Sequence, residues 1–112
     1  MRFEPRQWLE TVLPALLRSS TIAPPKPTTV IQLVISDRDD LDWVYEISRD
    51  AVNSRQGVSD DVDLTLSFFS KDIAALSANE LDVARAVRAS RIKVMGNQDV
   101  LRWFAQRLEV ES

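Results

Sequence analysis

The stretch VDLTLSFFSKDIAAL, residues 62–76, contains the change of period that decides the fold. Its first half alternates between apolar and polar side chains, which is typical of a strand with one buried face. The apolar positions of that half are Val62, Leu64, Leu66 and Phe68. The second half has helical spacing, with Ser70 as a candidate N-cap and Asp72 in the first turn. The stretch therefore predicts a strand over 62–69 that leads directly into a helix starting at Ser70.

Helical and strand patterns also alternate after this stretch. A second helix is predicted over 81–89, and a short strand over 91–95. Gly96 and Asn97 form a turn, and the Asn97 side chain can cap a last amphipathic helix over 98–110.

Strand patterns dominate the residues before the stretch. The segments 28–36 and 41–48 alternate around four polar residues, which predicts an antiparallel hairpin. Residues 51–56 are a weaker candidate for a third, edge strand.

The N-terminal part is helical and is set apart by prolines. Residues 5–19 carry a broad apolar stripe, and Pro14 inside them predicts a kink or a break because proline removes a helical hydrogen bond. A proline-rich connector over 20–27 separates this helix from a sheet and helix body over 28–110. A chain of 112 residues has the length of one domain, so residues 1–112 are expected to form a single unit.

Strands gathered in one part of the chain and helices in another define the α+β class. We expect a single antiparallel-rich sheet of about five strands, with helices packed on one face. Hydrophobic residues at 45% and charged residues at 28% are the composition of a globular domain rather than of a disordered chain.

Missing residue types exclude several kinds of chemistry. Without cysteine or histidine the chain has no thiolate, no imidazole base and no cysteine or histidine metal ligand. Gly57 and Gly96 are the only glycines, too few for a nucleotide-binding loop. The net charge of −3 argues against general nucleic-acid binding. We expect no cofactor, no metal and no catalytic residue, and with no targeting signal in view the cytoplasm is the expected location.

The run described above resembles the sterol carrier protein type 2 (SCP2) family of lipid-binding domains. The resemblance rests on the strand at 62–67, the helix start at 70–76, the Leu-Asp pair that opens 81–87 and the Arg-Ile-Lys-Val strand at 91–94. It implies a five-stranded sheet, helices over one face, and between them an apolar tunnel for acyl chains, sterols or similar molecules. The family fold has no catalytic residue or cofactor.

Apolar side chains expected on the inner face are the candidate tunnel walls. They are Leu33, Ile35, Trp43, Tyr45, Leu64, Leu66, Phe68, Leu76, Val83, Val87, Val94, Leu101 and Phe104. The alternative is that they fill a solid core. Tyr45, the only tyrosine, either orients a ligand head group or packs in the core with its hydroxyl at the edge.

Charge is distributed unevenly. Between residues 85 and 107 there are six basic residues and a single acid, Asp99. The exposed arginines of this part predict transient contact with an anionic membrane or an acidic partner, or else a solvated face that complements the acidic half of the fold. These arginines are Arg85, Arg88 and Arg91. The aspartates around residues 39–42 and 60–63 lack the spacing of a calcium loop and are interpreted as turn and edge residues.

The leading hypothesis is non-catalytic binding of a hydrophobic ligand, which the domain carries or presents to another protein or a membrane. One alternative is an assembly module with a closed pocket, acting as a homodimer or on a partner. A minor alternative is a small enzyme that uses the tunnel as a reaction chamber, with Tyr45 or a carboxylate as proton donor.

Overall fold

The computed structural model describes residues 4–18, 24–49, 51–78 and 80–108. The strands are β1 (Thr28–Ile35), β2 (Trp43–Ser48), β3 (Val52–Gln56), β4 (Leu64–Phe68) and β5 (Lys93–Gly96). The helices are α1 (Pro5–Gln7), α2 (Leu13–Arg18), α3 (Ser70–Ser77), α4 (Val83–Arg88) and α5 (Gln98–Arg107). A π-helical turn, Trp8–Val12, joins α1 to α2, and a 3₁₀ turn, Asp39–Leu41, precedes β2.

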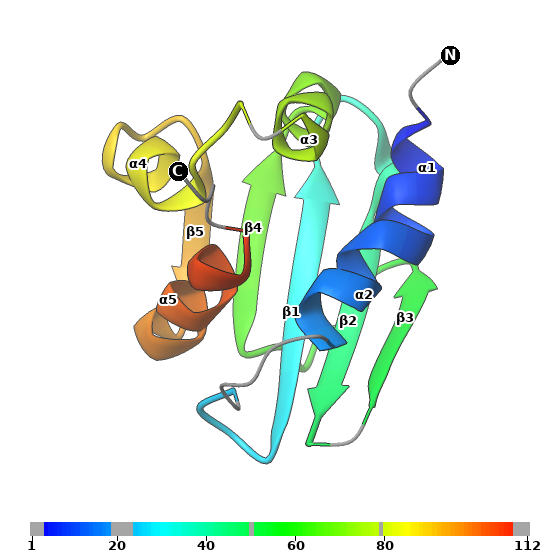
Figure 1. Cartoon of the computed structure of the whole chain (residues 1–112), viewed down its shortest axis with the longest axis vertical. Coiled ribbons are helices and arrows are strands. Elements are labelled where there is room, and N and C mark those ends of the chain that lie inside the picture. Colours follow the sequence, from blue (N-terminus) through cyan, green and yellow to red (C-terminus); the bar gives the residue numbers. More distant parts are fainter. Residues whose placement is uncertain (1–3, 19–23, 50, 79, 109–112) are drawn as a thin grey trace.

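The five strands form one sheet in the order β3-β2-β1-β4-β5. The helices lie on a single face of this sheet, which confirms the predicted α+β architecture (Figure 1). Most strand pairs are antiparallel, but β1 and β4 are parallel, with Leu33 opposite Leu66. The parallel pair arises because the chain leaves β3 at one edge of the sheet and crosses to the far side of β1 before β4 begins.

The crossing segment, residues 57–63, lies against the face of the sheet that the helices leave uncovered, and Gln32 holds it there. The Gln32 side chain is 3% exposed. Its Nε2 donates to the carbonyls of Trp43 and Gly57, both within 3.1 Å, and its Oε1 accepts from the Ser59 amide at 2.9 Å. This covering segment also explains why Val44, on the same face, is only 1% exposed.

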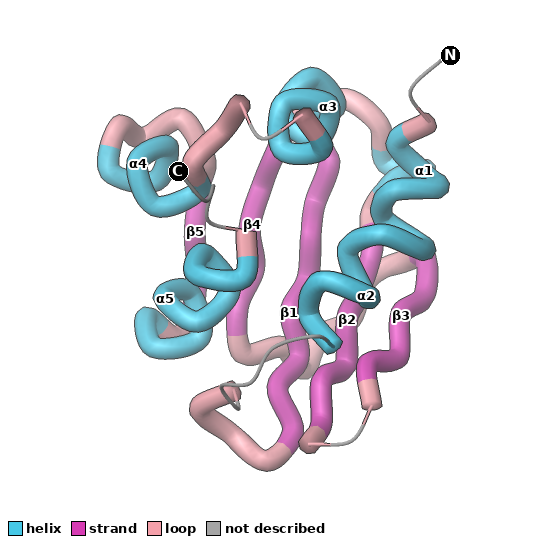
Figure 2. The backbone as a smooth tube through the Cα atoms, in the orientation of Figure 1, coloured by secondary structure: helices cyan, strands magenta, loops and turns pink. Residues whose placement is uncertain are grey.

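The core lies between the helices and the inner face of the sheet (Figure 2). Alternate residues of the strands, such as Ile31 and Leu33 in β1, are buried there, as the alternating pattern predicts. Leu9 and Leu13 from the N-terminal helix and Phe104 from α5 are fully buried against them. None of the helices within the described ranges has the length and apolarity needed to cross a bilayer.

Pro14 is accommodated by a π-helical turn rather than by a sharp break. The Leu13 amide donates to the carbonyl of Trp8, five residues back, instead of to Leu9. Pro14, five residues after Leu9, has no amide hydrogen to donate. The Leu9 carbonyl therefore receives a hydrogen bond neither from Leu13 nor from Pro14. The predicted disturbance at Pro14 is therefore present, as a π-helical turn that directly precedes it.

One predicted cap is confirmed and another is wrong. Asn97 caps α5, because its Oδ1 accepts from the amides of Asp99 at 2.8 Å and Val100 at 3.1 Å. Ser70 is the first residue of α3 and not its N-cap. Its amide and hydroxyl donate instead to the two carboxylate oxygens of Asp37, at 2.8 and 2.6 Å.

Element boundaries agree with the predicted ones or differ from them by up to three residues. The strand predicted from residue 62 begins at Leu64, because residues 57–63 belong to the crossing segment. The last helix ends at Arg107, and residues 109–110 of the prediction fall outside the described ranges. Residues 20–23 of the predicted connector also fall outside them; in its described part, Lys26 forms an ion pair with Asp63.

Candidate functional site

Ten of the thirteen residues predicted to line a tunnel belong to the buried core. Each is at most 7% exposed. They are Leu33, Ile35, Trp43, Tyr45, Leu64, Leu66, Phe68, Leu76, Val83 and Phe104. The remaining three, Val87, Val94 and Leu101, are partly buried and pack against the edge of this core. A ligand-binding role for the ten core residues stays a prediction.

A hollow of about 480 Å³ lies between α4 and α5. We call it the α4–α5 groove. Its apolar lining consists of Ala84 and Val87 from α4 and Leu101 and Ala105 from α5. Arg88 and Arg102 belong to its polar lining, as do Asp82, Gln98 and Gln106.

The local sequence explains how this groove forms. The buried sides of the two helices hold them on the sheet, through Val83 and Ala86 in α4 and Val100 in α5. Residues one position further along each helix then lie on its flank, about 100° away from the buried side. Two of these flank residues are Ala84 and Leu101, and the small side chain of Ala84 leaves space between the helices.

A second hollow, of about 620 Å³, lies at the β5 edge of the sheet. We call it the β5 hollow. Ile92, Val94 and Met95 provide its apolar lining and Lys93 its charge. Val87, Gln98 and Leu101 line both this hollow and the α4–α5 groove, so the two are neighbours that share a wall. Both volumes fall within the range of roughly 300–1,000 Å³ that small-molecule sites occupy.

Tyr45 has a structural role in the buried core. Its hydroxyl is buried and donates to the Leu9 carbonyl at 2.5 Å, the carbonyl left unsatisfied beside Pro14. Burial raises the pKa of the Tyr45 phenol above its ordinary value of 10.0. Tyr45 lines neither hollow, so of the two roles predicted for it the structure favours packing in the core.

Two of the tryptophans are also core residues. Trp43 and Trp103 are each 4% exposed. The indole nitrogen of Trp43 has no hydrogen-bond partner among the described residues. An unpaired buried donor is costly, so any ligand or water that brought an acceptor to this atom would stabilise the core.

The three arginines predicted to meet a partner have different roles. Arg91 donates to the carboxylate of Asp72, which is fully buried, at 3.0 Å. Arg88 lines the α4–α5 groove, whereas Arg85 on the same helix lines neither hollow. Arg91 thus has a structural role, and Arg88 is the only one of the three that lines the α4–α5 groove.

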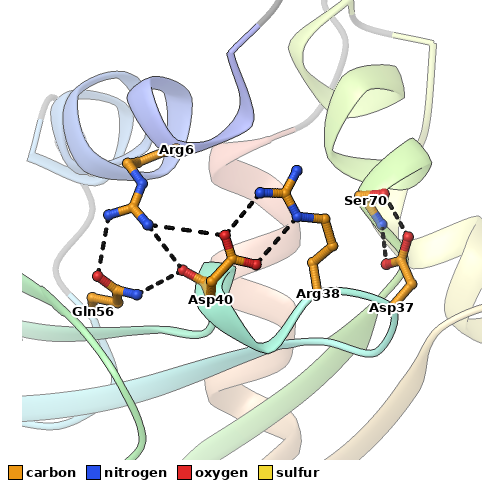
Figure 3. A network of polar contacts seen from close by, with 6 residues as sticks. All are labelled: Arg6, Asp37, Arg38, Asp40, Gln56 and Ser70. Atoms are coloured by element: carbon orange, nitrogen blue, oxygen red, sulfur yellow. Dashed lines mark hydrogen bonds and ion pairs between the residues drawn. The ribbon is translucent and has the colours of Figure 1, made fainter.

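The acidic residues serve turns and helix starts. Figure 3 shows Asp40 between two arginines: Arg38 donates to both of its carboxylate oxygens, and Arg6 to its carbonyl at 3.4 Å. Hydrogen bonds from Arg38 lower the pKa of Asp40, and those from Ser70 lower the pKa of Asp37. Within the described ranges no three acidic side chains gather closely enough to hold a metal ion.

The groove residues Ala84, Gln98, Arg102 and Ala105 were not among the predicted site residues. Alanine carries no signal for a binding surface, and its importance here comes from the space it leaves between two helices. Gln32 did give a signal, as an amide inside a strand of valine, isoleucine and leucine.

A five-stranded sheet with helices on one face, joined by the β3–β4 crossing, is the fold of SCP2-like domains. The chain belongs to the alkyl sulfatase C-terminal family, which matches residues 25–111. No curated protein sequence matches the chain.

Solved structures with this fold include domains of several proteins. The inverting sec-alkylsulfatase Pisa1 from Pseudomonas sp. is 18% identical with a TM-score of 0.71, over 98% of this chain and 17% of that one. The ubiquinone synthesis protein UbiJ-SCP2 is 16% identical with a TM-score of 0.66, over 97% and 93% of the two chains. Palmitated SCP2L2 from Aedes aegypti is 22% identical with a TM-score of 0.66, over 96% and 95%.

These comparisons confirm the resemblance to the SCP2 family at the level of fold. The chain spans less than a fifth of the alkyl sulfatase that it matches and nearly the whole of the SCP2 domains.

Proposed function

We propose that this domain binds a hydrophobic ligand, such as a lipid, a fatty acyl chain or a sterol-like molecule, without catalysing a reaction. The observation that carries the proposal is the pair of adjoining hollows around Val87, Val94 and Leu101, three residues that the sequence had already singled out. The fold supports it, because two Aedes aegypti proteins with this fold were solved with palmitate.

The size of the hollows suits an alkyl chain. Burial of one methylene group contributes roughly 0.8 kcal/mol. About nine buried methylenes would therefore contribute roughly 7 kcal/mol before the entropic cost of binding, which is substantial beside the ~5–15 kcal/mol stability of a typical domain.

Two substitutions separate the surface hollows from the core as the place of binding. Leu101 is partly buried and lines both hollows, so Leu101→Ala is expected to weaken ligand binding and to change stability little. Phe104 on the same helix is fully buried, so Phe104→Ala should cost about 3–5 kcal/mol of stability. Equal loss of affinity in both variants, after correction for the unfolded fraction, would move the ligand into the core tunnel that the resemblance implies.

The direct test is native mass spectrometry of the purified protein, followed by denaturing extraction of whatever co-purifies. A stoichiometric hydrophobic molecule that is released on unfolding supports the proposal and names the ligand class. If the protein carries nothing, calorimetric titration with fatty acids, fatty alcohols and sterols decides: absence of saturable binding to any of them would refute it.

A second candidate function, an assembly module, is supported by one observation. In Pisa1 the matching region is only 17% of a larger chain. A domain of this kind could dock on a catalytic partner or on a second copy, using exposed groups such as Arg85. Sedimentation analysis would show a concentration-dependent dimer if the second copy is the partner.

The structure gives the minor enzymatic alternative no support through Tyr45. Its hydroxyl is bonded to the Leu9 carbonyl and faces neither hollow. A general acid has to reach the group that it protonates. Tyr45→Phe should accordingly leave ligand affinity unchanged.

A further inference from the structure

We propose that the α4–α5 groove binds a single-chain anionic amphiphile. Its alkyl chain lies along Ala84, Leu101 and Ala105, and its head group lies between Arg88 and Arg102. This inference rests on the proposed function and adds the chemistry of the ligand and its place on the outer side of the helices.

The charge of the groove selects an anion. Arg88 has no ion-pair partner among the described residues, so its guanidinium is available to a ligand. Arg102 lies 3.8 Å from Asp99, but both side chains are more than 70% exposed. Exposed pairs of this kind are weak and are readily exchanged for a better acceptor. Guanidinium groups bind carboxylates, sulfates and phosphates through paired hydrogen bonds.

The one acid in the lining, Asp82, lies at the other end of α4 from Arg88. Asp82 is the N-cap of α4, and its carboxylate accepts from the Arg85 amide at 3.2 Å. Arg88 is the last residue of the same helix. Six helical residues separate their backbones by roughly 9 Å along the axis. Arg88 therefore favours an anionic head group near the C-terminal end of α4, and Asp82 disfavours one near its N-terminal end.

The apolar lining selects an alkyl chain of one molecule. Ala84 and Val87 of α4 and Leu101 and Ala105 of α5 form its apolar lining, in the same groove as the two arginines. A volume of about 480 Å³ lies toward the lower end of the range for small-molecule sites, which suits one chain better than a fused ring system. Two guanidinium groups beside an apolar lining match an amphiphile whose charge is at one end of its chain.

The test measures binding of three probes with the same alkyl chain by titration calorimetry, below the micelle concentrations of the ionic probes and below the solubility of the alcohol. The probes are decanoate, the neutral decanol and the cationic decyltrimethylammonium. Wild-type protein should bind decanoate most tightly and the cation most weakly. The double variant Arg88→Gln/Arg102→Gln should bind decanoate about tenfold more weakly and decanol within about twofold of wild type, since each exposed ion pair contributes a factor of a few.

A matched control removes the same charge elsewhere. Arg55 in β3 and Arg85 in α4 line neither hollow, so Arg55→Gln/Arg85→Gln should leave decanoate binding unchanged. The place of the alkyl chain is tested by Ala105→Phe, which fills the groove from a partly buried flank. It should weaken both decanoate and decanol, while the melting temperature shows that the fold is kept.

The outcomes distinguish this inference from the proposed function. Equal binding of decanoate and decanol, with no effect of Arg88→Gln/Arg102→Gln, would overturn the anionic head-group site and leave hydrophobic binding intact. An equal loss in the control double variant would show a general charge effect and would also overturn it. Binding that Ala105→Phe leaves unchanged places the ligand elsewhere. No binding of any probe overturns the amphiphile site, and the titrations described for the proposed function then decide the broader proposal.

Discussion

Replacing Tyr45 by phenylalanine should destabilise the domain, because the Leu9 carbonyl in the N-terminal helix would lose its hydrogen-bond donor. The Tyr45 hydroxyl donates to the Leu9 carbonyl at 2.5 Å, and both groups are buried. Along the helix no other donor is available to that carbonyl, because the Leu13 amide is bonded to Trp8 and Pro14 has no amide hydrogen. Tyr45→Phe keeps the ring and removes only the donor, so a buried acceptor is left unsatisfied.

The expected cost is about 1–3 kcal/mol, the usual penalty for one buried group without a partner. With a urea dependence of roughly 1–3 kcal/mol per molar for a small domain, the unfolding midpoint should fall by about 1 M. The assay is equilibrium unfolding in urea at neutral pH, followed by circular dichroism. As the only tyrosine, Tyr45 also permits an alkaline control. Because its folded pKa is raised, its contribution is complete below pH 10.0 and declines as the pH rises above that value, a decline that the variant should lack.

A double-mutant cycle with Pro14 tests the reasoning itself. Pro14→Ala supplies an amide hydrogen at position 14 and lets the helix satisfy Leu9 internally. Tyr45→Phe should then cost less in the Pro14→Ala background, with a coupling of about 1–2 kcal/mol between the two sites. An identical cost in both backgrounds, or no cost in the wild type, would refute the claim that Pro14 creates the acceptor that Tyr45 satisfies.

Three further predictions concern single contacts. Gly96→Ala should destabilise the domain by more than about 2 kcal/mol in urea unfolding. Gly96 has φ +121°, and an added Cβ would lie 2.3 Å from the Asp63 carbonyl oxygen. A stable variant would mean that β5 can move away from β4. Arg91→Gln should lower the free energy of unfolding by about 1–3 kcal/mol, because it weakens the pairing of the buried Asp72 carboxylate. Arg91→Lys should recover part of that loss. Full stability of the glutamine variant would contradict the pairing. Hydrogen bonds from Ser70, the first residue of α3, lower the pKa of the Asp37 carboxyl. Asp37 therefore contributes stability above about pH 3.8 that is lost as the pH falls through its folded pKa. Asp37→Asn should lack this acid-dependent contribution, and NMR titration of the wild type should give a pKa below 3.8.

Local patterns were sufficient for the elements and for the class of fold. The alternation at Leu64, Leu66 and Phe68 reports burial on one face, and burial is what the structure shows at all three. The same holds for the switch to helical spacing after Phe68, since neighbouring residues alone decide it. The resemblance to SCP2 domains added the expectation of an apolar tunnel between the helices and the sheet.

What local patterns do not contain is the pairing of distant segments. The parallel pairing of β1 with β4 depends on the path of residues 57–63 across the sheet, which no periodicity records. The buried state of Val44 has the same origin, because its strand pattern places it on the face opposite the core. The acceptor for Tyr45 could not be predicted either, since it exists only where a π-helical turn meets Pro14.

The candidate site illustrates the same division. Large apolar residues were predicted to form its walls, yet most of them fill the core, and the hollows lie where smaller side chains leave space. Ala84 and Ala105 become significant only once two helices are placed side by side on the sheet. Of the predicted residues, Val87, Val94 and Leu101 line the hollows, and each is partly buried at the edge of the core.

The N-terminal helix limits how far the domain can be truncated from its N-terminus. The family match begins at residue 25, but Leu9 and Leu13 are fully buried in the core. A protein expressed from residue 25 onward would expose the apolar sides of β1 and β2 to water and would deprive the Tyr45 hydroxyl of its acceptor. The smallest piece of this chain expected to stay folded and soluble therefore starts well before the region by which its family is recognised.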